Sequence, residues 1–272
     1  MNIRCDALCR CLRYLLLLTL LPCHANAADN PDSMGWYAWS GMDWVQQPRN
    51  LNRMSAGDRL LLSFTAQEWA QVTQNPQRLQ RLHLAARGRG ITLELLLGEP
   101  NWVLPEGRSH LTRLLRQIPA GIFSMAHLDL ERNQLPPSQQ AAWPENTLQT
   151  LREAVAASPV PVALITHYRE LQLDFVHALA QAGIREVTPM IYVANAQRTI
   201  EITRQLPRMP KGLRLSIAQS MERALPREES SFNLGQKQAL KHWREIRRQL
   251  RDIPEFRGIM VQSWEDYREA AP

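Results

Sequence analysis

The stretch that decides the fold is residues 124–134, SMAHLDLERNQ, in which polar and apolar residues alternate. His127, Asp129 and Glu131 take every second position, with a leucine between each pair. Residues two apart in a β-strand point to the same face, so these three side chains share one face. Because burying carboxylates in an apolar core is costly, such a face usually carries valine or isoleucine. The pattern therefore predicts a strand whose polar face lines the interior of a barrel.

Similar short apolar stretches recur along the chain on both sides of this one. They alternate with longer amphipathic segments, the pattern of helices, and Gly90, Gly183 and Pro210 separate helical segments from the strands that follow. The predicted strands span residues 35–40, 59–64, 91–97, 121–130, 160–166, 187–193, 212–218 and 257–262. The predicted helices span residues 77–89, 108–117, 147–157, 171–182, 196–205 and 236–250.

Eight strands that alternate with helices predict an α/β protein built as a single (β/α)8 TIM barrel. The alternative is an open, doubly wound sheet. A nucleotide-binding sheet of that kind usually has a glycine-rich turn after its first strand. Residues 40–43 (SGMD) follow the first strand here and lack that pattern. The barrel is therefore the preferred interpretation, and its active site is expected at the carboxyl ends of the strands.

Residues 1–27 have the layout of a secretory signal peptide. Arginines precede a short apolar run, and residues 25–27 (ANA) form a small-x-small cleavage site. The run is far shorter than the about 20 apolar residues that a membrane span needs. We therefore expect a signal peptide over residues 1–27, a barrel domain over residues 28–272 with no membrane span, and a periplasmic or secreted mature protein.

Composition narrows the classes of function. The chain is 44% hydrophobic and 21% charged, which is typical of a globular protein. The formal net charge of +6 is modest and its lysines and arginines are scattered, so nucleic acid is not an expected partner. All four cysteines lie within residues 1–27, so the mature chain is expected to have no disulfide and no thiolate nucleophile.

The strongest candidates for chemistry are the two carboxylates of the alternating stretch. Asp129 and Glu131 stand where the fourth predicted strand ends. Two neighbouring carboxyl groups repel each other, which raises one pKa and can keep a general acid protonated near neutral pH. The alternative is a structural role, in which an arginine holds Asp129 and Glu131 is already in solvent.

Aromatic and polar residues gather at the other predicted strand ends. The faces of indole rings stack on sugar rings, so a rim of tryptophans around carboxylates suits a carbohydrate cleft. The alternative is that some tryptophans pack beneath loops. The predicted substrate-binding residues are Trp39, Trp44, Trp102, His127, His167, Tyr168, Gln262 and Trp264.

Other kinds of site have little support. No HExxH pair occurs, so a metal is not expected, although His127, His167 and Asp129 could form the site of a metal-dependent polysaccharide deacetylase. No GxSxG motif marks a serine hydrolase. No cofactor is predicted.

Three short strings resemble glycoside hydrolase family 18, the chitinase-like barrels. That family ends strand four in D-x-D-x-E, carries M-x-Y on strand six and has a tryptophan near the end of strand eight. The corresponding strings here are His127 to Glu131 (HLDLE), Met190 to Tyr192 (MIY), and Trp264 after the eighth strand. His127 replaces the first aspartate of the family motif.

The resemblance implies a role for each matched residue. Glu131 would be the general acid, and Asp129 would orient an acetamido group of the substrate that acts as the nucleophile. Tyr192 would hydrogen-bond that group, and Trp264 would form the floor of a sugar subsite. The chain also looks more loosely like the small secreted glycosidase-like barrels of bacterial envelopes.

The sequence thus favours an exported glycoside hydrolase that acts on a polysaccharide or oligosaccharide through Glu131 and Asp129. If the resemblance is only architectural, the second catalytic carboxylate could be Glu99, Glu222 or Glu265. The alternative is a catalytically inactive carbohydrate-binding barrel that serves an exopolysaccharide secretion or adhesion system.

Overall fold

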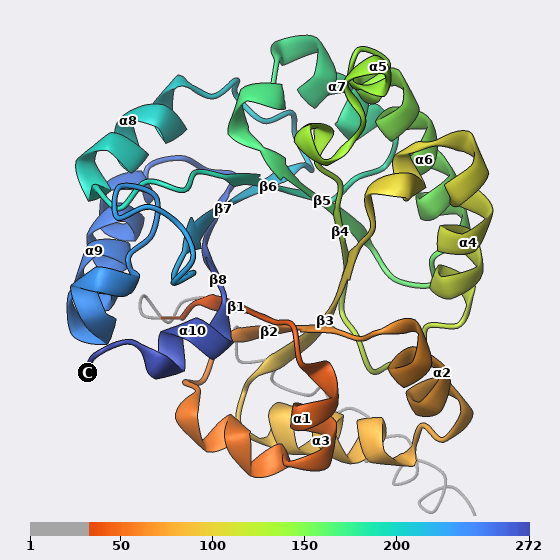
Figure 1. Ribbon diagram of the computed structural model, residues 1–272, viewed down its shortest axis with the longest axis horizontal. Helices are drawn as coiled ribbons and strands as arrows, with labels where there is room; N and C mark the ends of the chain where they lie inside the picture. Colours follow the sequence, from red (N-terminus) through yellow and green to blue (C-terminus); the bar gives the residue numbers. More distant parts are fainter. Residues whose placement is uncertain (1–32) are drawn as a thin grey trace, which may run out of the picture.

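The computed structural model describes residues 33–272, and the predicted signal peptide at residues 1–27 lies outside the described residues. Eight parallel strands close into a barrel in sequence order, each pairing with the next and β8 pairing with β1. Figure 1 looks into this ring of strands, with the helices around it. The chain is a (β/α)8 TIM barrel, as the sequence predicts.

All eight strands overlap predicted ones. They are β1 (Gly35–Ala38), β2 (Arg59–Ser63), β3 (Thr92–Gly98), β4 (Ala126–Asp129), β5 (Val162–His167), β6 (Glu186–Met190), β7 (Arg214–Ser220) and β8 (Phe256–Gln262). The β4 strand is shorter than predicted, because residues 121–125 form the turn that leads into it.

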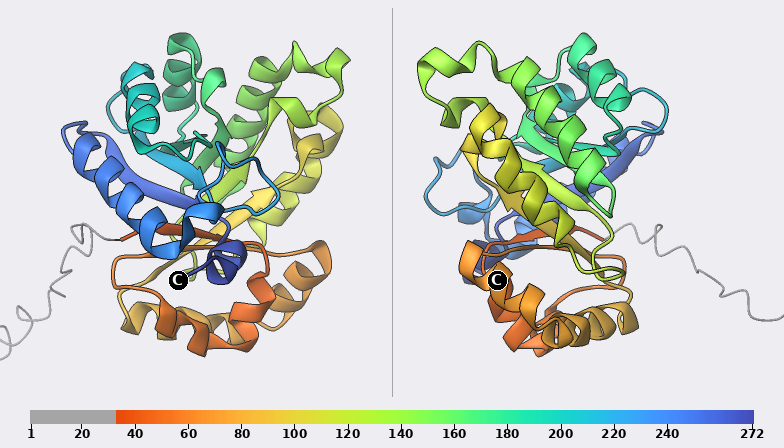
Figure 2. Two further views of the ribbon diagram at one scale, coloured as in Figure 1. Left: turned by 60° about the vertical axis from the view of Figure 1, so that its left-hand side comes forward. Right: turned by 90° about the vertical axis from the view of Figure 1, so that its right-hand side faces the viewer.

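The six predicted helices are all present, and Figure 2 shows from two sides how the helices pack around the strands. They are α3 (Gln77–Gly88), α4 (Pro105–Arg116), α6 (Trp143–Ala157), α7 (Leu173–Gln181), α8 (Ala196–Gln205) and α9 (Gly235–Leu250). Four shorter helices were not predicted, namely α1 (Gly41–Gln46), α2 (Ala66–Gln74), α5 (Pro137–Gln140) and α10 (Trp264–Glu269). The α2 helix did carry a readable signal, since Thr65 and Glu68 form a capping box at its start.

The strands separate two apolar regions. Outward-facing side chains pack against the helices in a large cluster that includes Trp36, Trp243 and Trp264. Inward-facing side chains form a smaller cluster inside the barrel. Its members are Tyr37, Leu61, Leu96, Ile165, Met190, Ala218 and Met260, with Tyr192 packed against them.

Strand register places the alternating residues of β4 on the inner face. His127 pairs with Leu96 of the inner cluster. Asp129, two residues further along the strand, pairs with Gly98. Two residues of a strand span about 6.6 Å, so His127 and Asp129 lie at different depths in the barrel. This difference in depth decides which of them can reach a ligand.

Within the described part of the chain, no helix is both long and apolar enough to cross a membrane.

Candidate active site at the carboxyl ends of the strands

Asp129 is the inward-facing residue at the carboxyl end of β4. The neighbouring position on β3 is Gly98, where a side chain would meet the Cβ atom of Asp129 at 3.3 Å, so the glycine leaves room for the carboxyl group. Burial, followed by the charges of Glu131 and Glu222, raises the pKa of Asp129 to about 8. Its buried Oδ1 atom has no hydrogen-bond partner among residues 33–272. Asp129 therefore carries a proton at neutral pH, and its buried Oδ1 atom has unused hydrogen-bonding capacity.

Glu131 follows β4 and is partly buried. Burial and the nearby charge of Glu222 raise its pKa, and a hydrogen bond from Asn133 opposes them. The side-chain amide of Gln134 donates a hydrogen bond to its Oε1 atom. A raised pKa favours the protonated form of a carboxyl group, the form that a general acid needs.

Glu222 completes a group of three carboxylates at this end of the barrel. It lies two residues after β7, where its backbone N–H donates to Ser220 Oγ at 3.0 Å and its Oε2 accepts from the same hydroxyl at 3.2 Å. Its charge acts on both Asp129 and Glu131, so the ends of β4 and β7 bring acidic groups to the same end of the barrel. We call Asp129, Glu131 and Glu222 the carboxylate triad.

The two other glutamates that the sequence offered as partners also follow strand ends, but each accepts a hydrogen bond from a different residue outside the triad. Glu99 is exposed and accepts a hydrogen bond from its near neighbour Asn101 at 3.1 Å. Glu265 accepts from the backbone N–H of Ser40 at 3.1 Å and so ties α10 to the end of β1. Neither charge contributes to the raised pKa of Asp129 or Glu131, whereas the charge of Glu222 contributes to both.

Tyr192 and Gln262 stand beside the triad. The Tyr192 hydroxyl donates to Gln262 Oε1 at 2.7 Å. Burial raises the pKa of Tyr192, and the charges of all three triad members add to the effect. The charge of Glu131 thus reaches Tyr192, the residue that the sequence analysis assigned to the same site. The hydroxyl of Tyr37, inside the barrel below, has no hydrogen-bond partner within residues 33–272.

His167 and Tyr168 lie at the end of β5, as expected, and both are partly exposed. Their rings are tilted against each other with centroids 4.6 Å apart. His167 Nδ1 accepts a hydrogen bond from the backbone N–H of Arg169 at 3.3 Å, which fixes the ring orientation. This pair offers an aromatic surface next to β4.

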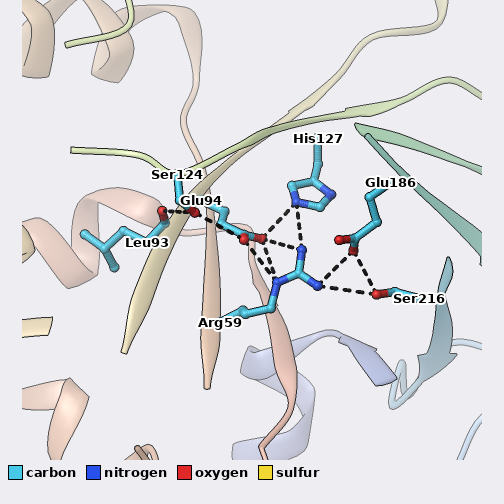
Figure 3. A network of polar contacts seen from close by, with 7 residues as sticks. All are labelled: Arg59, Leu93, Glu94, Ser124, His127, Glu186 and Ser216. Atoms are coloured by element: carbon cyan, nitrogen blue, oxygen red, sulfur yellow. Dashed lines mark hydrogen bonds and ion pairs between the residues drawn. The ribbon is translucent and has the colours of Figure 1, made fainter. Parts of the chain in front are cut away.

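His127 does not belong to this site, which corrects its assignment as a substrate-binding residue. Its side chain is completely buried, and its Nε2 atom lies 2.8 Å from Glu94 Oε2 and 3.3 Å from Arg59 Nη2. Figure 3 shows His127 beside the Arg59 guanidinium, together with Glu94 and Glu186. These partners stand at the amino ends of their strands, whereas the triad lies at the carboxyl ends.

The tryptophan rim expected from the sequence is reduced to one residue. Trp39 is 39% exposed, whereas Trp44, Trp102 and Trp264 are 2%, 5% and 3% exposed. Trp264 packs against Trp36 and Trp44, with ring centroids 5.1 and 5.4 Å away, between the barrel and its helices. Such burial leaves these three rings no free face for a sugar, so the sequence assignment of exposed stacking surfaces is corrected for them.

The residues considered for a metal-dependent deacetylase do not come together. His127 is hydrogen-bonded deep in the barrel, while His167 and Asp129 lie at the carboxyl end. No group of three or more histidine, cysteine, aspartate or glutamate side chains within residues 33–272 is arranged to hold a metal ion.

Comparison with known proteins places the fold but not the family. No family model matches the chain, and no curated protein is similar to it in sequence. A GH113 β-1,4-mannanase is similar in structure, with a TM-score of 0.53 at 9% identity, over 86% of this chain and 88% of that one. The GH113 β-mannanase AaManA from Alicyclobacillus acidocaldarius in complex with ManMIm gives a TM-score of 0.52 at 10% identity, over 86% of each chain. A 2,3-dimethylmalate lyase follows at a TM-score of 0.47 and 14% identity, over 86% of this chain and 76% of that chain. At these identities the similarity to the two mannanases establishes the TIM-barrel fold alone.

Replacing Asp129 with asparagine tests the electrostatics of the triad. Because folding raises the pKa of Asp129 to about 8, the unfolded chain releases the proton more readily, and wild-type stability falls as the pH rises from about 4 to about 8. The Asp129→Asn variant lacks this loss. Its stability relative to wild type should therefore grow by about 1–3 kcal/mol between pH 5 and pH 8. Urea unfolding at the two pH values measures the difference, and Asp174→Asn, at an exposed position of α7, should show no such growth.

Proposed function

We propose that this protein is an exported glycoside hydrolase that acts on a polysaccharide, with Glu131 as the general acid. The observation that carries the proposal is the carboxylate triad at the carboxyl ends of β4 and β7, where a TIM barrel places its active site. Glycoside hydrolysis needs a carboxyl group that holds a proton and a second carboxylate that does not. The raised pKa values of Asp129 and Glu131 favour carboxyl groups that hold a proton. The charge of Glu222 beside them supports a second group that stays ionised.

In the proposed reaction, Glu131 donates its proton to the glycosidic oxygen as the bond to the anomeric carbon breaks. Glu222 acts as the second carboxylate by one of two routes. It attacks the anomeric carbon, and water activated by the deprotonated Glu131 then cleaves the glycosyl–enzyme bond, or it removes the proton from a water molecule that attacks the anomeric carbon directly. Asp129, protonated at neutral pH, donates a hydrogen bond to the substrate and limits the charge within the site. Protonation of the leaving oxygen and stabilisation of the cationic sugar ring together lower the activation barrier for glycoside hydrolysis.

Substrate contacts are assigned to the side chains around the triad. Tyr192 and Gln262 form a hydrogen-bonded pair that can meet sugar hydroxyl or acetamido groups. His167, Tyr168 and Trp39 supply the accessible aromatic surface. The resemblance to family 18 suggests an N-acetylated sugar, for which Asp129 and Tyr192 would hold the acetamido group. The fold shared with the β-mannanases makes a neutral hexose the other substrate to test.

Release of new reducing ends tests the proposal. The mature chain is incubated with soluble oligosaccharides of chitin, β-1,4-mannan and β-glucan type, alongside Glu131→Gln and Glu99→Gln. Wild type and Glu99→Gln should release reducing ends from one class of oligosaccharide, and Glu131→Gln should not. Binding without products in the wild type would instead support the alternative, an inactive barrel that serves an exopolysaccharide system.

The proposal also includes export. Residues 1–27 would be removed as a signal peptide, so protein recovered from the periplasm or the medium should begin at Ala28 or within a residue or two of it. Amino-terminal sequencing measures this directly. An intact Met1 on the functional protein would refute export by this route.

Trp39 provides a prediction for binding. Because Trp39 is the exposed tryptophan at the end of β1, Trp39→Ala should weaken oligosaccharide binding by about 1–3 kcal/mol while changing stability by less than about 1 kcal/mol. Calorimetric titration and thermal unfolding measure the two quantities. The matched control is Leu84→Ala, which removes another exposed apolar side chain, 58% exposed on α3, and should leave affinity unchanged.

A further inference from the structure

A cavity of about 540 Å³ opens at the amino ends of the strands, at the opposite end of the barrel from the triad. Its lining carries five arginines and two glutamates. These are Arg59, Arg214, Arg247, Arg251, Arg257, Glu94 and Glu186. The proposed glycoside hydrolysis uses none of these residues. The positive charge of the cavity lining therefore points to a separate role.

The glutamates at the floor already have a partner. Arg59 lies between them, with its guanidinium 2.9 Å from Glu94 Oε2 and 2.8 Å from Glu186 Oε1. Ser216 Oγ donates to Glu186 at 2.8 Å, and His127 stands against Glu94 (Figure 3). At the floor, the positive charge of Arg59 is therefore engaged in ion pairs with the two glutamates.

A glycine leaves room for Arg247, one of the arginines that line the cavity. Gly258 of β8 pairs with Ser216, so any side chain there would point into the barrel. Its φ of +143° is rarely adopted by residues with a side chain, and a Cβ atom would stand 3.2 Å from Arg247 Nη1. The space instead lets the Arg247 guanidinium reach across from α9 and donate to Ser33.

The arginines of the rim are not matched by acidic partners. Arg214 of β7, Arg251 after α9 and Arg257 of β8 form no ion pair with any residue from 33 to 272. Burial and the neighbouring charge of Arg214 lower the pKa of Arg257. Three cations gathered at one opening repel each other, and an anion placed between them would relieve that repulsion.

We propose that this cavity binds a small polyanion that carries two or more phosphate or carboxylate groups. Guanidinium groups form paired hydrogen bonds with such groups, and arginines from β7, β8 and the end of α9 approach the mouth from different sides. The glutamates of the floor repel an anion that enters deeply, so the ligand lies at the rim and its separate charges meet separate arginines. The site is independent of the proposed hydrolase.

Calorimetric titration with inorganic pyrophosphate tests the proposal on the mature chain. Saturable binding of one equivalent is expected, at least about tenfold tighter than that of inorganic phosphate and weaker as the salt concentration rises. The double variant Arg214→Gln/Arg257→Gln should lose at least about tenfold in affinity. Arg198→Gln is the matched control, because Arg198 is an exposed arginine of α8 that pairs with Glu201. Absence of saturable binding, or an equal loss in the control, would overturn the proposal.

Three further measurements test the remaining explanations. Pyrophosphate should raise the Tm of the wild type but not of the double variant, whose own Tm without ligand should be unchanged or higher because a repulsion is removed. Tricarballylate in place of pyrophosphate distinguishes a carboxylate ligand from a phosphate ligand. Asp29 and Asp32 precede Ser33 in the sequence, so Asp29→Asn/Asp32→Asn is tested as well. Pyrophosphate binding in that variant alone would assign the site to the chain's own carboxylates and refute an external ligand.

Discussion

Replacing Glu131 with glutamine is expected to lower the rate of glycoside hydrolysis by about 10²–10⁴-fold, the usual contribution of a positioned general acid. Glutamine keeps the shape of the side chain and its contact with Gln134 but cannot donate a proton in place of the carboxyl group. Stability should stay within about 1 kcal/mol or rise slightly. The reason is that burial and Glu222 already disfavour the charged form of Glu131, which raises its pKa.

The control variants separate this role from a general effect of charge. Glu222→Gln should lose a comparable factor in rate if Glu222 is the second carboxylate, whereas Glu99→Gln should retain the wild-type rate. Initial rates of reducing-end release, measured with each variant, give the comparison. A Glu131→Gln enzyme with wild-type activity would exclude Glu131 as the acid.

Removing Arg59 should produce the largest loss of stability that we predict. Arg59→Met leaves Glu94 and Glu186 buried without their cation, and breaking a buried ion pair from one side costs about 3–5 kcal/mol. The side chains of these glutamates are 5% and 2% exposed, so solvent stabilises their charges far less than the arginine does. Denaturant unfolding of both proteins at pH 7 measures the loss.

The pH dependence of this loss follows from the charges. In the wild type, burial opposes ionisation of Glu94, but Arg59 and His127 outweigh it and lower its pKa to about 2. Its contribution to stability is therefore present above the unfolded pKa of about 4.3 and is lost only as the pH falls towards 2. In Arg59→Met the sign reverses, so the variant should gain stability as the pH falls from 7 to 5.

A matched variant tests the explanation. Replacing Arg59, Glu94 and Glu186 together with methionine or leucine removes all three charges and should recover much of the stability that Arg59→Met loses. If the triple variant were as unstable as Arg59→Met, lost packing rather than unpaired charge would be the cause.

The sequence predicted the barrel well because its strands repeat one physical pattern. Each strand is buried on two faces and therefore forms a short apolar run, and each is separated from the next by an amphipathic helix. The alternation at His127, Asp129 and Glu131 marked a strand with polar residues on its inner face, although Glu131 lies just beyond the end of β4. Four short helices escaped prediction because a helix of one or two turns has little room to show its period.

The site was only partly predictable because alternation reveals the face of a side chain but not its depth. His127 and Asp129 share the inner face of β4, yet one meets Glu94 and the other lies beside Glu131 and Glu222. Glu94 follows the same rule, since it is a single carboxylate in the apolar run of β3, residues 92–98. That signal could have placed a charged network inside the barrel before the structure was known.

The tryptophans show a second limit. A tryptophan just after a strand can point over the barrel or down into the space between strands and helices, and its position in the sequence does not distinguish the two. Trp39 lies on the surface, with 39% of its surface exposed. Trp264 is packed between the strands and helices, with 3% exposed. The packing of Trp264 against Trp36 depends on contacts between residues more than 200 positions apart.

The most direct test of the central claim is mass analysis of oligosaccharides incubated with the mature protein in water enriched in the heavy oxygen isotope. The account predicts shorter oligosaccharides whose new reducing end carries one heavy oxygen atom, formed by the wild type and not by Glu131→Gln. Oligosaccharides that bind but remain intact, or products that carry no heavy oxygen, would contradict hydrolysis by the carboxylate triad.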